Sequence, residues 1–195
     1  MVAARQAWWT GADGVGGVAP QRLVFLDECG VLTDMARLYG RGPRGTRACA
    51  SAPFGRWTRL TVLGALGHEG VIAAMSVEAA TGAAVFRAYL EEVLLPALRR
   101  ARPDAVLVRD NLAAHKAPRV RALLDASGFS YRYLPAYSPD LNPIEPIWAK
   151  VKAGLRRIAA RTAEALHEAL GPTLDTVTAQ DAAGCFRHCG YGRPS

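Results

Sequence analysis

The strands of this chain show as short apolar runs bounded by turn residues. The first run, Leu23 to Cys29, has the length of one buried strand. Two longer runs, Arg59 to Leu66 and Val71 to Val77, are separated only by Gly67-His-Glu-Gly70, and this spacing predicts a β-hairpin. Two further buried strands are predicted at residues 105–108 and 131–134.

Helical spacing of apolar residues alternates with these strands in the second half of the chain. Tyr89 and Val93 recur at a helical interval between Thr81 and Arg100, and Thr81 has the side chain of a helix cap. Strands that first pair antiparallel and then alternate with helices predict an α/β fold, a mixed sheet with helices on both faces. Further helices are predicted at residues 117–126, from 143 to about 157, and at 162–177.

The same pattern divides the chain into one domain and two short ends. Residues 1–20 hold the end of a helix and a glycine-rich loop, and we expect them to form an N-terminal extension. Residues 21–178 carry the strands and helices of the domain, and residues 179–195 are expected to be a C-terminal tail. Residues 37–56 are rich in Arg, Gly and Pro, which predicts an extended basic loop.

Composition favours one class of partner and excludes another. The formal net charge of +7 favours a polyanionic partner such as nucleic acid. No stretch approaches the roughly 20 apolar residues that a membrane helix needs, and the first residues do not resemble a signal peptide. We therefore expect no membrane partner and a cytoplasmic location.

Cysteine and histidine residues cluster near the end of the chain, at Cys185, His188 and Cys189. A tetrahedral zinc site needs a fourth ligand, and no second cluster supplies one. We expect these cysteines to be reduced, as is typical of a cytosolic protein.

Two acidic residues stand where strands otherwise carry apolar side chains. Asp27 lies near the end of the first predicted strand, and Asp110 ends the run Val106-Leu-Val-Arg-Asp110. A carboxylate in an apolar setting is costly unless it is paired or binds a metal, and ligands of open α/β sheets bind outside the carboxyl ends of strands. The pair therefore predicts one shared site, with an N-cap or a buried ion pair as the alternative. Side chains alternate across a strand, so only one of Asp27 and Glu28 can share that site, and periodicity does not decide which.

Glu145 has two interpretations. Asn142 suits a helix N-cap and Pro143 the first helical position, so Glu145 would stand third and complete a capping box. The same first-turn position suits a metal ligand, since the apolar stripe through Trp148 and Val151 would press this helix onto the core. Three carboxylates from two strands and one helix are what two-metal phosphoryl chemistry uses, with Mg²⁺ as the ion that prefers oxygen ligands.

Three segments carry recognisable motifs. They are Leu26-Asp-Glu-Cys-Gly30, Arg109-Asp-Asn-Leu-Ala-Ala-His-Lys116 and, most specific, Leu134-Pro-Ala-Tyr-Ser-Pro-Asp-Leu-Asn-Pro-Ile-Glu-Pro-Ile-Trp-Ala-Lys-Val-Lys152. Together they resemble the DDE-superfamily endonucleases, specifically the bacterial insertion-sequence transposases related to the mariner group. Residues 111–144, which separate Asp110 from Glu145, match the usual spacing of that family, and the resemblance extends over residues 20 to 177.

The resemblance implies a ribonuclease-H-like fold and the catalytic domain of a transposase, which cleaves DNA and transfers strands in transposition and integration. It implies that Asp27, rather than Glu28, acts with Asp110 and Glu145 as the catalytic residues, and that these three bind two Mg²⁺ or Mn²⁺ ions. Asn111, Asp140 and Asn142 are expected to support the ligands or shape the loops. His115 has two interpretations, a contact to DNA phosphate or a histidine satisfied within its loop.

The partners implied by the resemblance are the transposon ends, the target DNA and a second copy of the chain, in the nucleoid of a bacterial cell. Nothing before Gln21 resembles the helix-turn-helix region of the family. We therefore expect the catalytic half alone, as a truncated copy or as one frame of a split gene whose upstream frame encodes a helix-turn-helix polypeptide. Three positions depart from the family pattern: Cys29 replaces Thr, Arg109 an apolar residue and Ala136 a frequent Pro.

Two alternatives to a transposase remain open at this point. The first is a ribonuclease-H-like nuclease that acts on RNA–DNA hybrids or structured DNA. The second is an inactive transposase remnant that binds DNA through its basic surface, although intact carboxylates at all three positions argue against a remnant.

Overall fold

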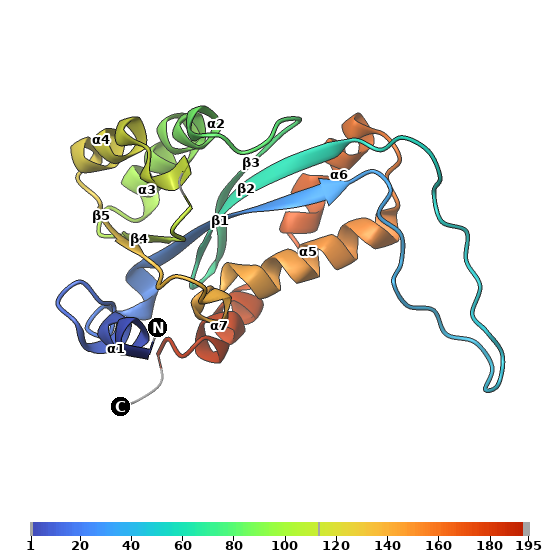
Figure 1. Ribbon diagram of the computed structural model, residues 1–195, viewed down its shortest axis with the longest axis horizontal. Coiled ribbons are helices and arrows are strands. Elements are labelled where there is room, and N and C mark those ends of the chain that lie inside the picture. Colours follow the sequence, from blue (N-terminus) through green and yellow to red (C-terminus); the bar gives the residue numbers. More distant parts are fainter. Residues whose placement is uncertain (1, 113, 193–195) are drawn as a thin grey trace.

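A five-stranded sheet forms the centre of the computed structural model, which describes residues 2–112 and 114–192 (Figure 1). The strand order is β3-β2-β1-β4-β5. β1 pairs antiparallel with β2 and β2 with β3, whereas β4 is parallel to β1 and β5 is parallel to β4. This confirms the predicted mixed sheet. The strands are β1 (Leu23–Leu32), β2 (Arg59–Gly67), β3 (Gly70–Val77), β4 (Val106–Arg109) and β5 (Ser130–Tyr133).

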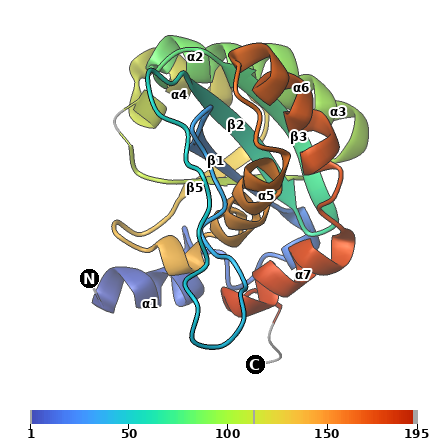
Figure 2. The same cartoon turned by 90° about the vertical axis from the view of Figure 1, so that its right-hand side faces the viewer.

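Helices cover both faces of this sheet, as predicted (Figures 1 and 2). Alternation along β1 divides the core, because Phe25 and Val31 belong to one hydrophobic cluster and Val24 and Leu26 to the other. The first cluster includes α5 (Ile144–Ile158), α6 (Ala163–Leu174) and α7 (Ala179–His188). The second includes α2 (Ala83–Ala88), the π-helical turn η2 (Tyr89–Leu94), α3 (Leu95–Ala101) and α4 (Pro118–Ser127).

The helix predicted from Thr81 to Arg100 is interrupted. A π-helical turn, η2, separates α2 from α3, and Pro96 stands in the first turn of α3. Proline lacks the N–H that an α-helix would use there, which accounts for a break in the α-helical hydrogen-bond pattern before Pro96. The predicted cap at Thr81 is wrong, because the N-cap is Gly82, which makes no side-chain cap bond.

The two chain ends pack against the domain. α1 (Val2–Thr10) buries Trp8, whose Nε1 donates to the hydroxyl of Tyr191 at 3.1 Å. Beyond residue 178, where we expected a tail, α7 begins with a capping box between Thr178 and Asp181 and buries Phe186. Trp8, Phe186 and Tyr191 belong to the same core cluster as α5, so both ends form part of one hydrophobic core.

The segment between β1 and β2, residues 33–58, contains no helix or strand and is called the basic loop here. It projects from the body of the molecule (Figure 1). This confirms the extended loop predicted from its composition. Four large apolar side chains stand exposed on it: Leu38, Tyr39, Phe54 and Trp57.

Candidate active site

Asp27 lies in the middle of β1 and faces α5. Its predicted place near the end of the strand is wrong, because pairing with β2 extends β1 to Leu32. Its partner across the β1–β2 pair is Gly64, and a Cβ atom on Gly64 would lie 2.5 Å from the indole ring of Trp148. The missing side chain therefore lets Trp148 pack directly onto the sheet beside Asp27. Ile144, Trp148 and Val151 are buried, so the first turn of α5 comes to rest over this part of β1.

Asp110 follows β4 directly, and β4 is the parallel neighbour of β1. The register pairs Leu26 with Arg109, which places Asp110 beside Asp27 at the point where β4 ends and β1 continues to Leu32. Both residues line one pocket of about 390 Å³ together with Glu145 and the loop of residues 134–139. The structure thus brings all three carboxylates predicted from the sequence to one pocket, from two adjacent strands and one helix.

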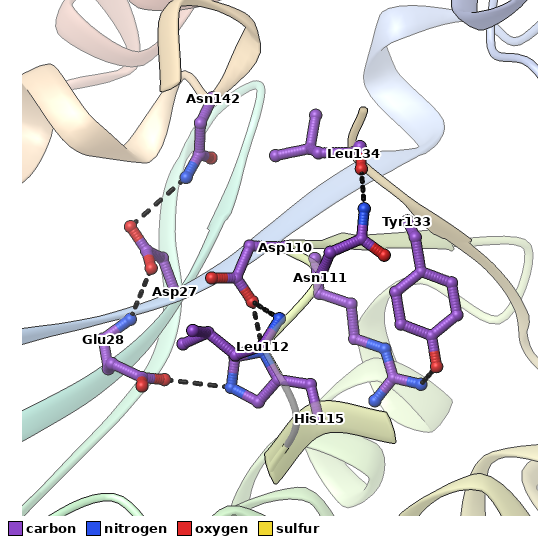
Figure 3. A network of polar contacts seen from close by, with 10 residues as sticks. Asp27, Glu28, Asp110, Asn111, Leu112, His115, Tyr133, Leu134 and Asn142 are labelled. Carbon is purple, nitrogen blue, oxygen red and sulfur yellow. Dashed lines mark hydrogen bonds and ion pairs between the residues drawn. The ribbon is translucent and has the colours of Figure 1, made fainter. Parts of the chain in front are cut away.

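The carboxylate of Asp27 is held on both sides. Its Oδ1 accepts the backbone N–H of Glu28 at 2.8 Å, and its Oδ2 accepts from the side-chain amide of Asn142 at 3.2 Å (Figure 3). Burial, followed by the negative charge of Glu145 and then that of Asp110, raises the pKa of Asp27 to about 7. An anion in this position is destabilised by its neighbours, which a bound cation would relieve.

Glu145 is not part of a capping box. The N-cap of α5 is Pro143, it makes no side-chain cap bond, and the side chain of Asn142 reaches Asp27 instead. The predicted cap at Asn142 is therefore wrong, because its side chain is used to hold a carboxylate of the pocket. Glu145 itself is exposed at the pocket, so helix capping no longer competes with a ligand role for this residue.

A buried histidine connects Asp110 to Glu28. His115 has no exposed surface, its Nδ1 lies 2.5 Å from Asp110 Oδ1, and its Nε2 lies 3.0 Å from Glu28 Oε2 (Figure 3). The proposed contact of His115 to DNA phosphate is wrong, because the ring is enclosed, and the interpretation as a satisfied histidine is confirmed. Burial lowers the pKa of His115, but the hydrogen bonds to Asp110 and Glu28 act more strongly in the opposite direction. The pKa of His115 is therefore raised to about 9.

The same contact acts on Asp110. Burial alone would raise the pKa of Asp110, but hydrogen bonding to His115 and its charge lower that pKa below the ordinary value. Asp27 and Asp110 thus differ: the first resists ionisation and the second favours it. Of the neighbours Asp27 and Glu28, Asp27 lies in the pocket and Glu28 reaches Asp110 only through His115. The contact between Glu28 and His115 was not predicted. Two features of the sequence pointed to it, a histidine five residues after Asp110 and a second acidic residue next to Asp27.

The remaining motif residues hold the loops of the pocket, as expected. The side-chain amide of Asn111 donates to the carbonyl of Leu134, which joins the loop after β4 to the loop after β5. Asp140 pairs with Arg5 of α1, and Arg5 also donates to Ser138 at 3.0 Å. The rim of the pocket is therefore attached to the N-terminal helix.

The donor set of the pocket is suited to a hard divalent cation, because all three side chains are carboxylates. Among the residues that the structure describes, no three acidic, His or Cys side chains lie close enough together to hold an ion as they stand. The mutual repulsion that raises the pKa of Asp27 is nevertheless what a cation at this position would remove. The cluster at Cys185, His188 and Cys189 gives no metal group within the described ranges either, and its cysteines are free.

The mixed five-stranded sheet with helices on both faces is a ribonuclease-H-like fold. The chain belongs to the DDE superfamily endonucleases, because the model of that family matches residues 22–167. None of the curated protein sequences matches the chain significantly. No helix of the described residues is long and apolar enough to cross a membrane.

Solved structures of the mariner transposase Mos1 share the fold. Mos1 in a paired-end complex with a left transposon end gives a TM-score of 0.70 at 20% identity, over 96% of this chain and 56% of that one. The Mos1 strand transfer complex gives 0.67 at 22% identity, over 87% and 52%. The Mos1 catalytic domain with raltegravir and Mn gives 0.63 at 18% identity, over 96% and 84%. The chain thus spans about half the length of the Mos1 chains in the DNA complexes and most of the isolated catalytic domain.

Proposed function

We propose that this chain is the catalytic domain of a transposase related to the mariner group, which cleaves DNA and transfers DNA strands with divalent metal ions. The observation that carries the proposal is the convergence of Asp27, Asp110 and Glu145 on one pocket in a chain of the DDE family. Mos1 structures with transposon-end DNA, and with Mg or Mn in its catalytic domain, support it by likeness of fold.

In this proposal Asp27 and Asp110 hold two Mg²⁺ or Mn²⁺ ions from the sheet, and Glu145 completes the ligands from α5. Bound in this pocket, the ions would activate the attacking oxygen and stabilise the leaving oxygen of a phosphodiester. Asn142 keeps one oxygen of Asp27 in place, and Asn111 holds the loop that follows Asp110. These residues orient the ligands and leave the carboxylates turned to the pocket.

The basic loop supplies a surface for DNA and for a second copy of the chain. Five arginines lie on it, and the structure describes no ion pair for any of them. Cationic side chains beside exposed aromatic rings are the combination that binds nucleic acid backbones and bases. A homodimer, an upstream helix-turn-helix polypeptide that selects the transposon ends, and action at a bacterial nucleoid belong to the same proposal. The arginines are Arg37, Arg41, Arg44, Arg47 and Arg56.

A plasmid nicking assay tests the proposal without knowledge of the transposon ends. The chain is incubated with supercoiled plasmid DNA and Mg²⁺ or Mn²⁺, and relaxed DNA is the expected product. Asp27→Asn, Asp110→Asn and Glu145→Gln should each abolish nicking, whereas Glu92→Gln, at an exposed position outside the pocket, should not. Undiminished nicking in the presence of a chelator would overturn the proposal.

The same preparation separates the two alternatives. A ribonuclease-H-like nuclease would cleave an RNA–DNA hybrid in preference to duplex DNA of the same sequence. A remnant that only binds would retard DNA in a gel without nicking it, and metal ions would leave its melting temperature unchanged. Nicking of duplex DNA with little cleavage of the hybrid supports the transposase.

A further inference from the structure

The imidazole of His115 has no freedom to turn. It is fully buried, both of its nitrogens face carboxylates, and its ring centroid lies 4.0 Å from that of Phe86 in α2. The residue belongs to the short turn η3 (Ala114–Lys116) in the connection between β4 and α4. A side chain held on three sides fixes the position of whatever it binds.

Glu28 connects that turn to the most rigid part of the fold. It lies on β1, the central strand, and it projects to the face opposite Asp27, where its side chain is 19% exposed. Residues 110–112 belong to no helix or strand, so the backbone of this segment does not by itself fix the carboxylate of Asp110. The contact from Glu28 to His115 ties the segment back to the sheet.

Only one of the two carboxylate oxygens of Asp110, Oδ1, takes part in hydrogen bonds among the described residues. Its Oδ1 accepts from the backbone N–H of Leu112 at 3.1 Å and lies against His115, whereas none of the hydrogen bonds among the described residues uses Oδ2. Oδ2 points to the side of Asp27 (Figure 3). The arrangement holds one oxygen and presents the other to the pocket.

We propose that Glu28 and His115 form a tether that positions Asp110 for metal binding. Both acids of the Asp27-Glu28 pair then serve the same site from opposite faces of β1, Asp27 in the pocket and Glu28 through His115. The inference rests on the proposed function, and it adds Glu28 as a positioning residue that touches neither metal nor DNA.

Partners that orient metal ligands have a measurable effect when they are removed. Their loss typically lowers metal affinity or activity by about 10- to 100-fold. Catalysis depends on geometry even more steeply, since a displacement of about 1 Å can lower a rate by about 100-fold. The tether therefore predicts a loss of metal affinity that appears before any DNA is added.

Binding of Mn²⁺ to the whole chain, measured by calorimetry or by the electron paramagnetic resonance of the free ion, tests the tether. Glu28→Ala should weaken binding by about 10- to 100-fold. Glu28→Gln should recover most of the loss, because the amide oxygen still accepts from His115 Nε2–H. Glu92→Ala removes the same charge from an exposed position and should leave Mn²⁺ affinity unchanged. Equal Mn²⁺ affinity in Glu28→Ala and the unmodified chain would overturn the tether.

A double substitution checks that the two residues act as a unit. Glu28→Ala combined with His115→Gln should weaken Mn²⁺ binding no more than the stronger of the single substitutions, because each breaks the same connection. Additive losses would contradict the tether. If Glu28→Ala does not fold, the comparison of Glu28→Gln with His115→Gln decides, since only the second should weaken Mn²⁺ binding strongly.

The outcomes for the tether and for the proposed function differ. Mn²⁺ binding that depends on Glu28 in a chain that nicks no plasmid would support the tether and refute the nuclease. If the chain nicks plasmid DNA but Glu28→Ala binds Mn²⁺ as tightly as the unmodified chain, the result would support the nuclease and refute the tether.

Discussion

The pocket and the basic loop differ in the sign of their charge and in the exposure of their side chains. The carboxylates of Asp27 and Asp110 are partly buried and hydrogen bonded, and the pocket is acidic. The basic loop carries five arginines, and its aromatic side chains Tyr39 and Phe54 are 90% and 106% exposed. Chemistry on a phosphodiester needs fixed ligands, whereas contact with a DNA backbone needs accessible charge. Under the proposed function, catalysis and DNA contact therefore belong to separate regions, and substitutions should affect one without the other.

The largest expected effect comes from the pocket. Asp110→Asn should lower the rate of plasmid nicking by about 10³-fold or more, because a missing ligand removes several kcal/mol of transition-state stabilisation. DNA affinity, measured by fluorescence anisotropy of a labelled duplex, should stay the same or rise, since the substitution removes a negative charge. A parallel loss of DNA affinity would contradict the separation of the two regions.

The basic loop should show the reverse behaviour. Replacing Arg41, Arg44 and Arg47 together by Ala should weaken DNA binding by about 10- to 100-fold at low salt. The slope of log K against log salt should fall by up to about 0.9 for each phosphate contact that is lost. The increase in melting temperature caused by Mn²⁺ should not change. A smaller Mn²⁺ effect in this triple variant would show that the loop also shapes the pocket.

The pH dependence of stability between pH 5 and pH 7 reports mainly on Asp27. The pKa of Asp27 is raised to about 7 in the folded chain from its ordinary value of 3.8. Between these values the folded chain binds more protons than the unfolded chain, so the free energy of unfolding without metal should fall as pH rises. From pH 5 to pH 7 the fall should be about 2 kcal/mol.

Asp27→Asn provides the control for this pH dependence. It removes the contribution of Asp27 and should flatten the slope between pH 5 and pH 7, measured by urea unfolding in the presence of a chelator. His115, with a pKa of about 9 against an ordinary 6.5, contributes in the same direction, but its contribution is lost mainly above pH 7. An unchanged slope in Asp27→Asn would mean that Asp27 is ionised throughout. Metal binding should show the opposite trend and strengthen as pH rises, because the ion binds the deprotonated carboxylate.

Both regions were partly predictable from the sequence, for different physical reasons. Apolar runs set the strands, and the strand register then fixes Asp27 beside Asp110. Two of the three carboxylates of the pocket therefore follow from local pattern and topology. The basic loop follows from composition alone, because Arg, Gly and Pro without apolar periodicity cannot form a packed element.

What the sequence did not reveal depends on side-chain directions and long-range contacts. Asn142 and Glu145 have the spacing of a capping box, yet the extended backbone of Asn142 carries its amide to Asp27, 115 positions earlier in the chain. His115 and Glu28 meet 87 positions apart, a contact that no local pattern encodes. The helix α7 was missed for a related reason, since its apolar face is completed by Trp8 and Tyr191 from opposite ends of the chain.

The smallest expected effect concerns Arg109, the departure from the family pattern that adjoins Asp110. Its side chain is 1% exposed, and its Nε and Nη1 have no hydrogen-bond partner among the described residues. Nη2 donates to the hydroxyl of Tyr133 at 2.6 Å, and the guanidinium lies 5.0 Å and 4.6 Å from the ring centroids of Tyr131 and Tyr133. Burial lowers the pKa of Arg109, so the fold bears a cost for the charge that the two rings only partly offset.

Arg109→Leu should therefore raise the free energy of unfolding by about 1 kcal/mol, because an apolar side chain removes the desolvation of a buried cation that has no acidic partner among the described residues and of its two unpartnered nitrogens, Nε and Nη1. Urea unfolding checks the change, with Arg109→Met as a variant that keeps an unbranched stem. Plasmid nicking and Mn²⁺ binding should change little, because the guanidinium is hydrogen bonded to Tyr133 rather than to Asp110, and its charge lowers the pKa of Asp110 less than His115 does. A loss of stability in both variants would show that the stack of Arg109 on the two tyrosines outweighs its burial. A loss of Mn²⁺ affinity would show instead that Asp110 is positioned from the β5 side of the sheet as well as through Glu28 and His115.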